Sequence, residues 1–237
     1  MKGNTVLTRI KIMNIGVILA GGVGARLSKT EIKQYIKIAD KECISYVIEA
    51  FANAKNCDEI VVVENEAQYK EKYVEKEYGI HCCCGGNTRN ESIYNGLLYI
   101  NDHFPECDKV LFHDGARPFI RQDIVEDFFD LLDENDCVVN CVEITDGIGK
   151  YMNRIAERDE YYISQTPEGF HFKQFFKAFK YDKPILALTH HLPEDAKIGH
   201  YRKFPYNLKL TKQEDLFVAE VLIKSGFIEY MKSIKNL

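Results

Sequence analysis

The chain of 237 residues lacks long hydrophobic runs, a surplus of basic charge and any Cys-x-x-Cys pair. No stretch approaches the ~18 apolar residues that a membrane-spanning helix needs. The formal net charge is −5, whereas binding to nucleic acid depends on a basic surface that neutralises phosphates. These absences argue against an integral membrane protein and against a general nucleic-acid binder.

The eight cysteines do not form the pattern of a zinc site or a disulfide framework. Cys82, Cys83 and Cys84 are too crowded for all three to ligate one zinc ion. Residues 1–13 carry basic residues but no long apolar core, so we expect no secretory leader and an N-terminal extension outside the fold. We therefore expect a cytoplasmic protein with reduced cysteines.

The composition is that of an ordinary globular protein, with 46% hydrophobic and 28% charged residues. The length suffices for one large α/β domain with a sizeable core, which we place at residues 14–237. Short apolar runs alternate with stretches of helical or polar character, and this pattern predicts a doubly wound, mostly parallel, Rossmann-like sheet. The expected strands are 15–19, 60–63, 80–84, 109–112 and 136–142, and the expected helices are 45–54, 66–78, 123–132, 170–181 and 217–224.

The stretch from Asn14 to Tyr35 carries the strongest chemical signal. A β-branched strand runs into glycines, and a loop without Cβ atoms lets backbone N–H groups approach a phosphate closely. An arginine then adds a planar guanidinium group, and a lysine adds a mobile point charge. The stretch therefore predicts a polyphosphate site, with a plain glycine turn and solvated basic residues as the alternative. The residues concerned are Gly21, Gly22, Gly24, Arg26 and Lys33.

Two familiar phosphate-binding loops do not match this stretch. A dinucleotide fingerprint that starts at Gly22 needs a third glycine where Leu27 stands. A nucleoside-triphosphatase P-loop needs Gly-Lys-Ser/Thr, and here Lys29 follows Ser28. The missing third glycine counts against a nicotinamide-dependent oxidoreductase, which we keep as a distant alternative.

Two later strand ends carry polar residues that belong at the same edge of the sheet. Gly85 to Ser92 forms a glycine loop before a predicted helix, which fits either ligand binding or simple helix capping. Asp114 follows a buried strand, where a hard oxygen donor could hold Mg²⁺ against nucleotide phosphates. The alternative for Asp114 is a buried ion pair with Arg117.

Several motifs together resemble one family, in its order, from Asn14 to Lys224. Leu-Ala-Gly-Gly-x-Gly-x-Arg and Lys-Gln-Tyr resemble the opening signature of nucleotidyltransferases that join a sugar or polyol phosphate to a nucleoside monophosphate. The later motifs Gly-Gly-x-x-Arg-x-x-Ser, His-Asp-x-Ala-Arg-Pro and Asn-Leu-Lys-Leu-Thr are similar to those of cytidylyltransferases acting on 2-C-methyl-D-erythritol 4-phosphate or D-ribitol 5-phosphate. The chain departs from the family at Ile32 (usually Pro), Glu168 (Gln) and Tyr206 (often an acid).

The resemblance implies roles for individual residues. Gly86, Asn87 and Ser92 would read the cytosine base, Asp114 would hold Mg²⁺ and the ribose, and Lys209 would reach the α-phosphate. Segment 143–165 would be a protruding β-arm that embraces a second subunit of a homodimer. The full prediction is Arg26, Lys33 and Lys209 as catalytic; Ala20, Gly21, Gly22, Val23, Gly24, Ala25, Gly86, Asn87, Ser92 and Asp114 for the nucleotide; and Arg117, Arg158 and Thr166 for the acceptor.

The predicted reaction follows from these charges and the resemblance. A phosphate oxygen of the acceptor attacks the α-phosphorus of CTP, and pyrophosphate leaves. Ala-Gly-Gly in place of the family's Ala-Ala-Gly favours a ribitol 5-phosphate-like acceptor, with methylerythritol phosphate as the alternative. The irregular segment Thr189–Ile198 leaves a less usual phosphorylated acceptor open. A non-catalytic nucleotide-binding or scaffold protein is disfavoured because it would not need both Lys33 and Lys209.

Lys33→Ala should lower turnover by several orders of magnitude while leaving the fold intact, because the lysine charge would act on the transition state more than on bound substrate. A steady-state assay of pyrophosphate release measures this loss. A near-normal rate would remove Lys33 from the catalytic set.

Overall fold

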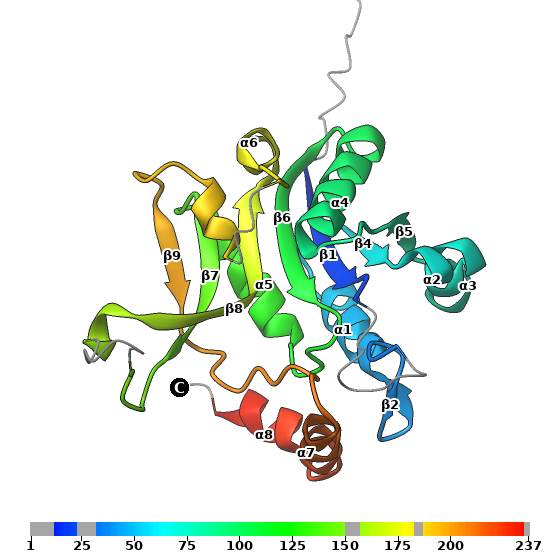
Figure 1. The fold of residues 1–237 in the computed structure, drawn as a ribbon, viewed down its shortest axis with the longest axis vertical. Coiled ribbons are helices and arrows are strands. Elements are labelled where there is room, and N and C mark those ends of the chain that lie inside the picture. The colour runs from blue at the N-terminus through cyan, green and yellow to red at the C-terminus, as the bar shows by residue number, and fades with distance from the viewer. Residues whose placement is uncertain (1–11, 23–31, 150–156, 183–186, 235–237) are drawn as a thin grey trace, which may run out of the picture.

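The computed structural model describes residues 12–22, 32–149, 157–182 and 187–234. Across these residues the centre of the molecule is a seven-stranded sheet with the strand order β5-β4-β1-β6-β8-β7-β9 (Figure 1). Its strands are β1 (Met13–Ala20), β4 (Glu59–Glu64), β5 (His81–Cys84), β6 (Cys107–Asp114), β7 (Cys137–Glu143), β8 (Tyr162–His171) and β9 (Ile198–Tyr201). A small antiparallel pair, β2 (Lys37–Ile38) and β3 (Lys41–Glu42), lies outside this sheet.

The helices pack on both sides of the sheet, as the predicted α/β fold requires. They are α1 (Cys43–Ala52), α2 (Glu66–Glu71), α3 (Tyr73–Tyr78), α4 (Arg89–His103), α5 (Gln122–Leu131), α6 (Phe172–Ala178), α7 (Gln213–Lys224) and α8 (Phe227–Ser233), with short 3₁₀ turns η1 (Arg158–Glu160) and η2 (Leu188–His191). In the part of the chain that the structure describes, no helix combines the length and apolar character that crossing a membrane requires. All eight cysteines are free thiols.

The strand directions confirm a mostly parallel sheet. β1 pairs in parallel with β4 and β6, and β4 pairs in parallel with β5. β8 runs antiparallel between β6 and β7, and β9 is parallel to β7. The four neighbouring parallel strands therefore end at one edge, where their following loops meet.

The core lies in two layers, one on each face of the sheet. Along β1, Ile15 and Val17 belong to the layer under α4 and α6, whereas Ile18 and Ala20 belong to the layer under α1 and α5. All four side chains are fully buried. This explains why the strand reads as an unbroken apolar run rather than as an alternating one.

Two expected helices differ from those observed. The helix expected over 66–78 is divided into α2 and α3 at Lys72, whose left-handed backbone (φ 54°) ends the first helix and lets the chain turn so that Val74 is buried. The helix expected from residue 170 begins at Phe172, because Phe170 still pairs with Val110 in the sheet. Neither α8 nor the β2–β3 pair was expected.

The expected arm corresponds to the outer ends of β7 and β8. These strands stay paired from Asn140–Gln165 to Glu143–Tyr162 and project from the sheet (Figure 1). Tyr161, Tyr162 and Ile163 are exposed there. Residues 150–156 of the expected arm segment lie outside the described residues, as does most of the expected N-terminal extension.

Gly16→Ala should destabilise the fold, because a Cβ atom on Gly16 would lie 2.2 Å from Cδ1 of the fully buried Phe51 ring. We expect a loss of about 1–3 kcal/mol in the free energy of unfolding, measured by urea denaturation. Gly147→Ala is the matched control, since a Cβ there meets nothing within 4 Å, and it should change stability by less than about 0.5 kcal/mol. Equal stability of the two variants would contradict the packing of Phe51 against β1.

Candidate active site

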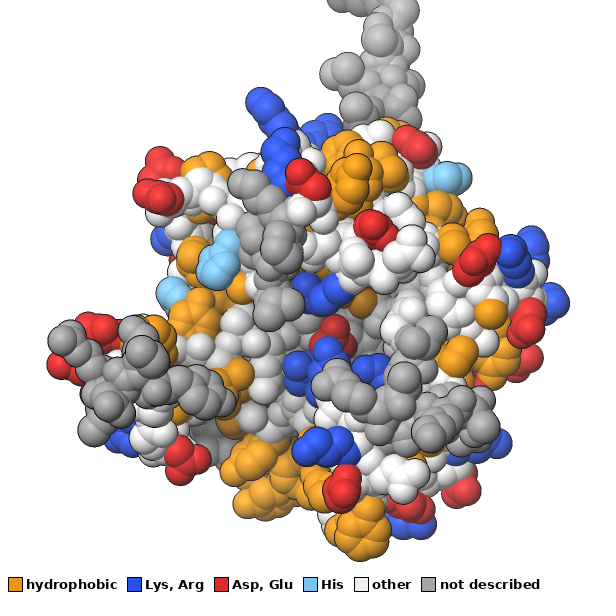
Figure 2. Space-filling view, in the orientation of Figure 1, with side chains coloured by type: hydrophobic (Ala, Val, Ile, Leu, Met, Phe, Trp, Pro, Cys, Tyr) orange, Lys and Arg blue, Asp and Glu red, His pale blue; other side chains and the backbone are white. Residues whose placement is uncertain are grey.

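A hollow of about 720 Å³ opens where the parallel strands end. It is lined by the loops that follow β1, β4, β5 and β6. Figure 2 shows it near the middle of the visible face, with basic side chains gathered around an acidic one. The residues at its wall include Gly21, Gly22, Lys33, Gln34, Asn65, Gly86, Asn87, Thr88, Arg89, Ser92, Asp114 and Lys209.

The first glycine loop reaches this pocket through its described residues. Gly21 and Gly22 line the wall, and a Cβ on Gly22 would lie 4.0 Å from Cε of Lys33. Ala20 lies just below, fully buried at the end of β1. The structure therefore brings the loop and the predicted catalytic lysine to one wall, while the predicted residues Val23, Gly24, Ala25 and Arg26 lie outside the described residues.

The second glycine loop is held in shape by the start of α4. Thr88 caps this helix in a capping box with Glu91, whose Oε2 also accepts a 2.6 Å hydrogen bond from the Asn87 N–H. The Ser92 Oγ accepts from the Gly86 N–H at 3.1 Å and donates to the Thr88 carbonyl at 3.0 Å. A Cβ on Gly86 would lie 2.2 Å from Cβ of Glu91, so this position needs glycine. Helix capping is thus present, and it fixes the loop that lines the pocket.

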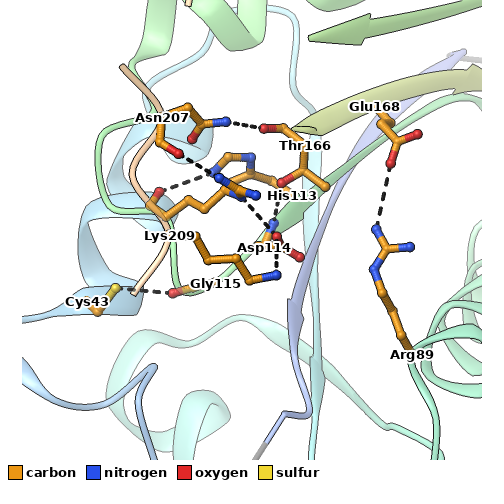
Figure 3. A network of polar contacts seen from close by, with 10 residues as sticks. Cys43, Arg89, His113, Asp114, Gly115, Thr166, Glu168, Asn207 and Lys209 are labelled. Carbon is orange, nitrogen blue, oxygen red and sulfur yellow. Dashed lines mark hydrogen bonds and ion pairs between the residues drawn. The ribbon is translucent and has the colours of Figure 1, made fainter. Parts of the chain in front are cut away.

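Asp114 forms the electrostatic centre of the pocket (Figure 3). Its Oδ2 accepts hydrogen bonds from Nε of Arg117 at 3.0 Å and from Nζ of Lys209 at 2.8 Å. Burial alone would raise the pKa of Asp114, but the charges of Lys209 and Arg117, with Arg89 farther away, outweigh burial and hold this pKa well below its usual range. Asp114 is therefore ionised at neutral pH.

Lys209 reaches Asp114 because a distant segment is tied beside the end of β6. The Leu210 N–H donates to the Ala116 carbonyl at 2.9 Å, and Arg117 Nη1 donates to the Asn207 carbonyl at 2.6 Å. Asn207 in turn donates to the Thr166 carbonyl of β8, and Thr166 Oγ1 accepts from the Asp114 N–H at 3.2 Å. These bonds join three segments that are far apart in sequence.

His113 does not add charge to this cluster. It is fully buried, and its Nε2 lies 3.2 Å from the Arg117 carbonyl. Burial lowers the pKa of His113 to about 3, so the imidazole is neutral at physiological pH. Its role is to pack beneath the turn that carries Asp114 and Arg117.

The predicted acceptor residues occupy three different places. Arg117 lines a neighbouring hollow of about 480 Å³, which it shares with Lys209 and Tyr206. Thr166 is buried beside Asp114. Arg158 is exposed on the arm, where its Nη1 donates to the Thr145 carbonyl at 2.5 Å. The structure thus brings Arg117 and Thr166, but not Arg158, close to Asp114 of the same chain.

Asp114 is the predicted metal ligand, and the described residues show no group of three or more His, Cys, Asp or Glu that could enclose a metal ion. Both ion pairs of Asp114 end on Oδ2, so Oδ1 is the oxygen with which this carboxylate could hold Mg²⁺. Tyr206, at the position where relatives often carry an acid, is an exposed aromatic residue. The donor set fits an ion held by one carboxylate and completed by nucleotide phosphates and water.

One buried acid next to the site, Glu168, was not among the predicted site residues. Glu168 is 2% exposed, its Oε1 lies 3.7 Å from Nη2 of Arg89, and its Oε2 accepts from the Leu188 N–H at 3.0 Å. Burial raises the pKa of Glu168 to about 7, although Arg89 and the Leu188 N–H oppose the shift. The only sequence signal for it was the replacement of the family's Gln after Thr-Pro.

Glycine loops and basic side chains around Asp114, at the ends of parallel strands, are the features of a site that binds the phosphates of a nucleotide. The model of one family, 2-C-methyl-D-erythritol 4-phosphate cytidylyltransferase (IspD), matches residues 14–225. The chain therefore belongs to this cytidylyltransferase family.

Relatives with different stated acceptors are about equally similar. The chain is 31% identical over 220 residues to 2-C-methyl-D-erythritol 4-phosphate cytidylyltransferase of Thermosipho melanesiensis, covering 88% of this chain and 97% of that protein. It is 33% identical over 226 residues to ribitol-5-phosphate cytidylyltransferase of Lactiplantibacillus plantarum, covering 87% and 97%.

Longer proteins and solved structures also match. The chain is 32% identical over 248 residues to the bifunctional ribulose 5-phosphate reductase/CDP-ribitol pyrophosphorylase Bcs1 of Haemophilus influenzae, covering 96% of this chain and 52% of that protein. The crystal structure of 4-diphosphocytidyl-2C-methyl-D-erythritol synthase from Anaerococcus prevotii matches with a TM-score of 0.75 at 23% identity, over 90% of this chain and 96% of that one. This structural likeness confirms the fold.

Asp114→Asn should destabilise the protein, because it leaves Arg117 and Lys209 beside each other without their shared negative charge. We expect a loss of about 2–4 kcal/mol in the free energy of unfolding at pH 7, measured by guanidinium denaturation. The folded-state pKa of Asp114 is lowered, so this stability is present above the ordinary pKa of about 4 and is lost as the pH falls below it. The gap between wild type and variant should therefore narrow in acid.

Glu49→Gln is the matched control, because Glu49 forms a half-exposed surface pair with Lys41. Its effect should stay below about 1 kcal/mol. If Asp114→Asn were as stable as this control, the stability of the fold would not depend on the pairing of the two cations with Asp114.

Proposed function

We propose that this protein transfers CMP from CTP to a polyol or sugar phosphate, with a ribitol 5-phosphate-like acceptor favoured, and releases pyrophosphate. The observation that carries the proposal is the meeting of Lys33, Lys209 and Asp114 with two glycine loops in one pocket. Its volume of about 720 Å³ lies within the range of small-molecule sites. Membership of the cytidylyltransferase family supports the same reaction.

The chemistry needs positioning and charge rather than a protein nucleophile. An oxygen of the acceptor's phosphate attacks the α-phosphorus of CTP, the bond to the β-phosphate oxygen breaks, and pyrophosphate leaves. Lys33 and Lys209 would stabilise the negative charge that spreads over the transferring group, together with Arg26. Lys209 is held at the pocket by Asp114 before substrate arrives, so it needs little reorganisation.

Mg²⁺ is the proposed cofactor, and when bound it would neutralise charge on the nucleotide phosphates. Asp114 is the residue that would hold it, through the carboxylate that already faces the pocket. On the other side of the pocket, Gly86, Asn87 and Ser92 would recognise the cytosine base. The fixed geometry of their loop suits a planar ligand that is read by backbone and hydroxyl groups.

The acceptor would bind near Arg117 and Thr166, and a second subunit would contribute Arg158. Arg158 is half-exposed on the projecting arm, which suits a residue that acts in a neighbour's pocket. We therefore propose a homodimer in which the arms at 143–165 exchange. Ala20-Gly21-Gly22 supports the ribitol 5-phosphate-like acceptor, while the family match supports methylerythritol phosphate at least as well.

One assay tests the reaction and the acceptor together. The protein is incubated with CTP, Mg²⁺ and single acceptors, including ribitol 5-phosphate and 2-C-methyl-D-erythritol 4-phosphate, and pyrophosphate release is measured. Pyrophosphate release with ribitol 5-phosphate supports the favoured acceptor. Release with methylerythritol phosphate alone would make methylerythritol phosphate the acceptor instead. Failure of CTP to raise the thermal stability of the folded protein, together with no release, would overturn the proposed function.

Mixing two inactive variants should restore activity if the subunits share their sites. Arg158→Ala and Lys33→Ala proteins would each be inactive, but a mixed dimer holds one intact site. Random re-association should restore about a quarter of wild-type activity, because half of the dimers are mixed and each has one intact site of two. Continued inactivity of a mixture shown to contain mixed dimers would contradict the role of the arm.

A further inference from the structure

Glu168 joins two segments that are far apart in the sequence. It lies on β8, and its carboxyl faces Arg89, the first residue of α4 (Figure 3), and accepts from the N–H of Leu188, the first residue of η2. Arg89 follows the base-side loop 85–88 directly and lines the pocket itself. η2 leads into the irregular segment Thr189–Ile198. A single buried carboxyl therefore connects the helix start beside the base-side loop to the start of η2.

The two contacts of this carboxyl differ in what they need. The bond from the Leu188 N–H needs only an oxygen acceptor, which a glutamine would also supply. The contact with Arg89, at 3.7 Å, depends on negative charge. Arg89 is one-third exposed toward the pocket, so its positive charge acts on Glu168 and on any bound anion.

We propose that Glu168 is a positioning residue for nucleotide binding, which orients Arg89 beside the base-side loop and offsets the positive charge that Arg89 presents to the triphosphate. This inference rests on the proposed function and deepens it. With Glu168 charged, Arg89 is shared between the carboxylate and the ligand. With Glu168 neutral, one negative charge beside Arg89 is removed, so Arg89 attracts an anionic ligand more strongly.

The charge of Glu168 changes near physiological pH. Burial raises its pKa to about 7, against the opposing effects of Arg89 and the Leu188 N–H. Protonation below this value removes one negative charge beside Arg89, so the pocket becomes more positive as the pH falls. Other titratable or charged groups also interact electrostatically with Glu168. They are Asp114 at the end of β6, Arg117 in the turn that follows, Cys137 on β7 and Tyr162 on β8.

The test measures the dissociation constant of CTP by calorimetry from pH 6 to 8.5, without Mg²⁺ and with a chelator, for wild type and Glu168→Gln. Glutamine keeps the acceptor for Leu188 and removes the charge. The ratio of the two constants cancels the titration of CTP itself. Wild type should match the variant at pH 6 and bind about fivefold more weakly at pH 8.5, a factor typical of one partly exposed ion pair.

Two further variants separate this role from a merely structural one. Arg89→Gln removes the cationic partner of Glu168. The ratio of CTP affinities between Arg89→Gln and the double variant Arg89→Gln/Glu168→Gln should therefore not vary with pH. Glu71→Gln makes the same chemical change at an exposed site on α2 and should follow wild type at every pH. If Glu168→Gln did not fold, the test would depend on comparing the CTP dissociation constants of Arg89→Gln and wild type across the same pH range.

The outcomes distinguish the two proposals. A constant ratio of wild type to Glu168→Gln across this pH range would overturn the role of Glu168, even if the protein transfers CMP. Absence of CTP binding by folded wild type at any pH would overturn the proposed function instead. The positioning role is supported if the CTP dissociation constant of wild type, divided by that of Glu168→Gln, rises as the pH passes about 7. The same ratio for wild type and Glu71→Gln should stay constant.

Discussion

The site depends on one shared carboxylate. Asp114 accepts from Arg117 and from Lys209, and these two cations hold it ionised despite its burial. A buried charge of this kind is costly unless it is paired and hydrogen-bonded. The pairing also fixes the position of Lys209, which is 95 residues away in the sequence. Loss of the carboxylate would therefore change both the charge and the shape of the pocket.

The parallel sheet explains why the other groups gather around Asp114. Each parallel strand ends at the same edge, and each is followed by a loop that lines the pocket. The glycines at these loops bring backbone N–H groups close to the space where phosphates would lie. A chain with a net charge of −5 can thus present a pocket in which basic side chains gather around Asp114, while most other acidic side chains in view lie toward the edges of this face (Figure 2).

Family membership leaves the acceptor open because the matched relatives are named for different acceptors. The relatives named for methylerythritol phosphate and for ribitol phosphate are similar to this chain at 31% and 33% identity. Glu168 links the start of α4, which lines the pocket, to the start of η2.

The local sequence predicted the parts of the site that depend on backbone shape. Gly21, Gly22, Gly86 and Asp114 stand directly after apolar strands, so their place at the sheet edge followed from the order of strands and helices alone. The motifs likewise indicated the family and the mostly parallel fold. The division of helix 66–78 at Lys72 was missed because the residues on both sides have helical character, and only the burial of Val74 requires the turn.

Tertiary structure alone decided the long-range contacts. The bond from Asn207 to Thr166, the approach of Lys209 to Asp114 and the burial of Glu168 between Arg89 and Leu188 join segments separated by tens of residues. No local pattern encodes such contacts, because they depend on how strands β6 and β8 and the segment before α7 pack together. The sequence by itself determined which chemical groups the pocket would hold, whereas packing determined which of them share charge, because electrostatic pairing depends on distance and burial in space.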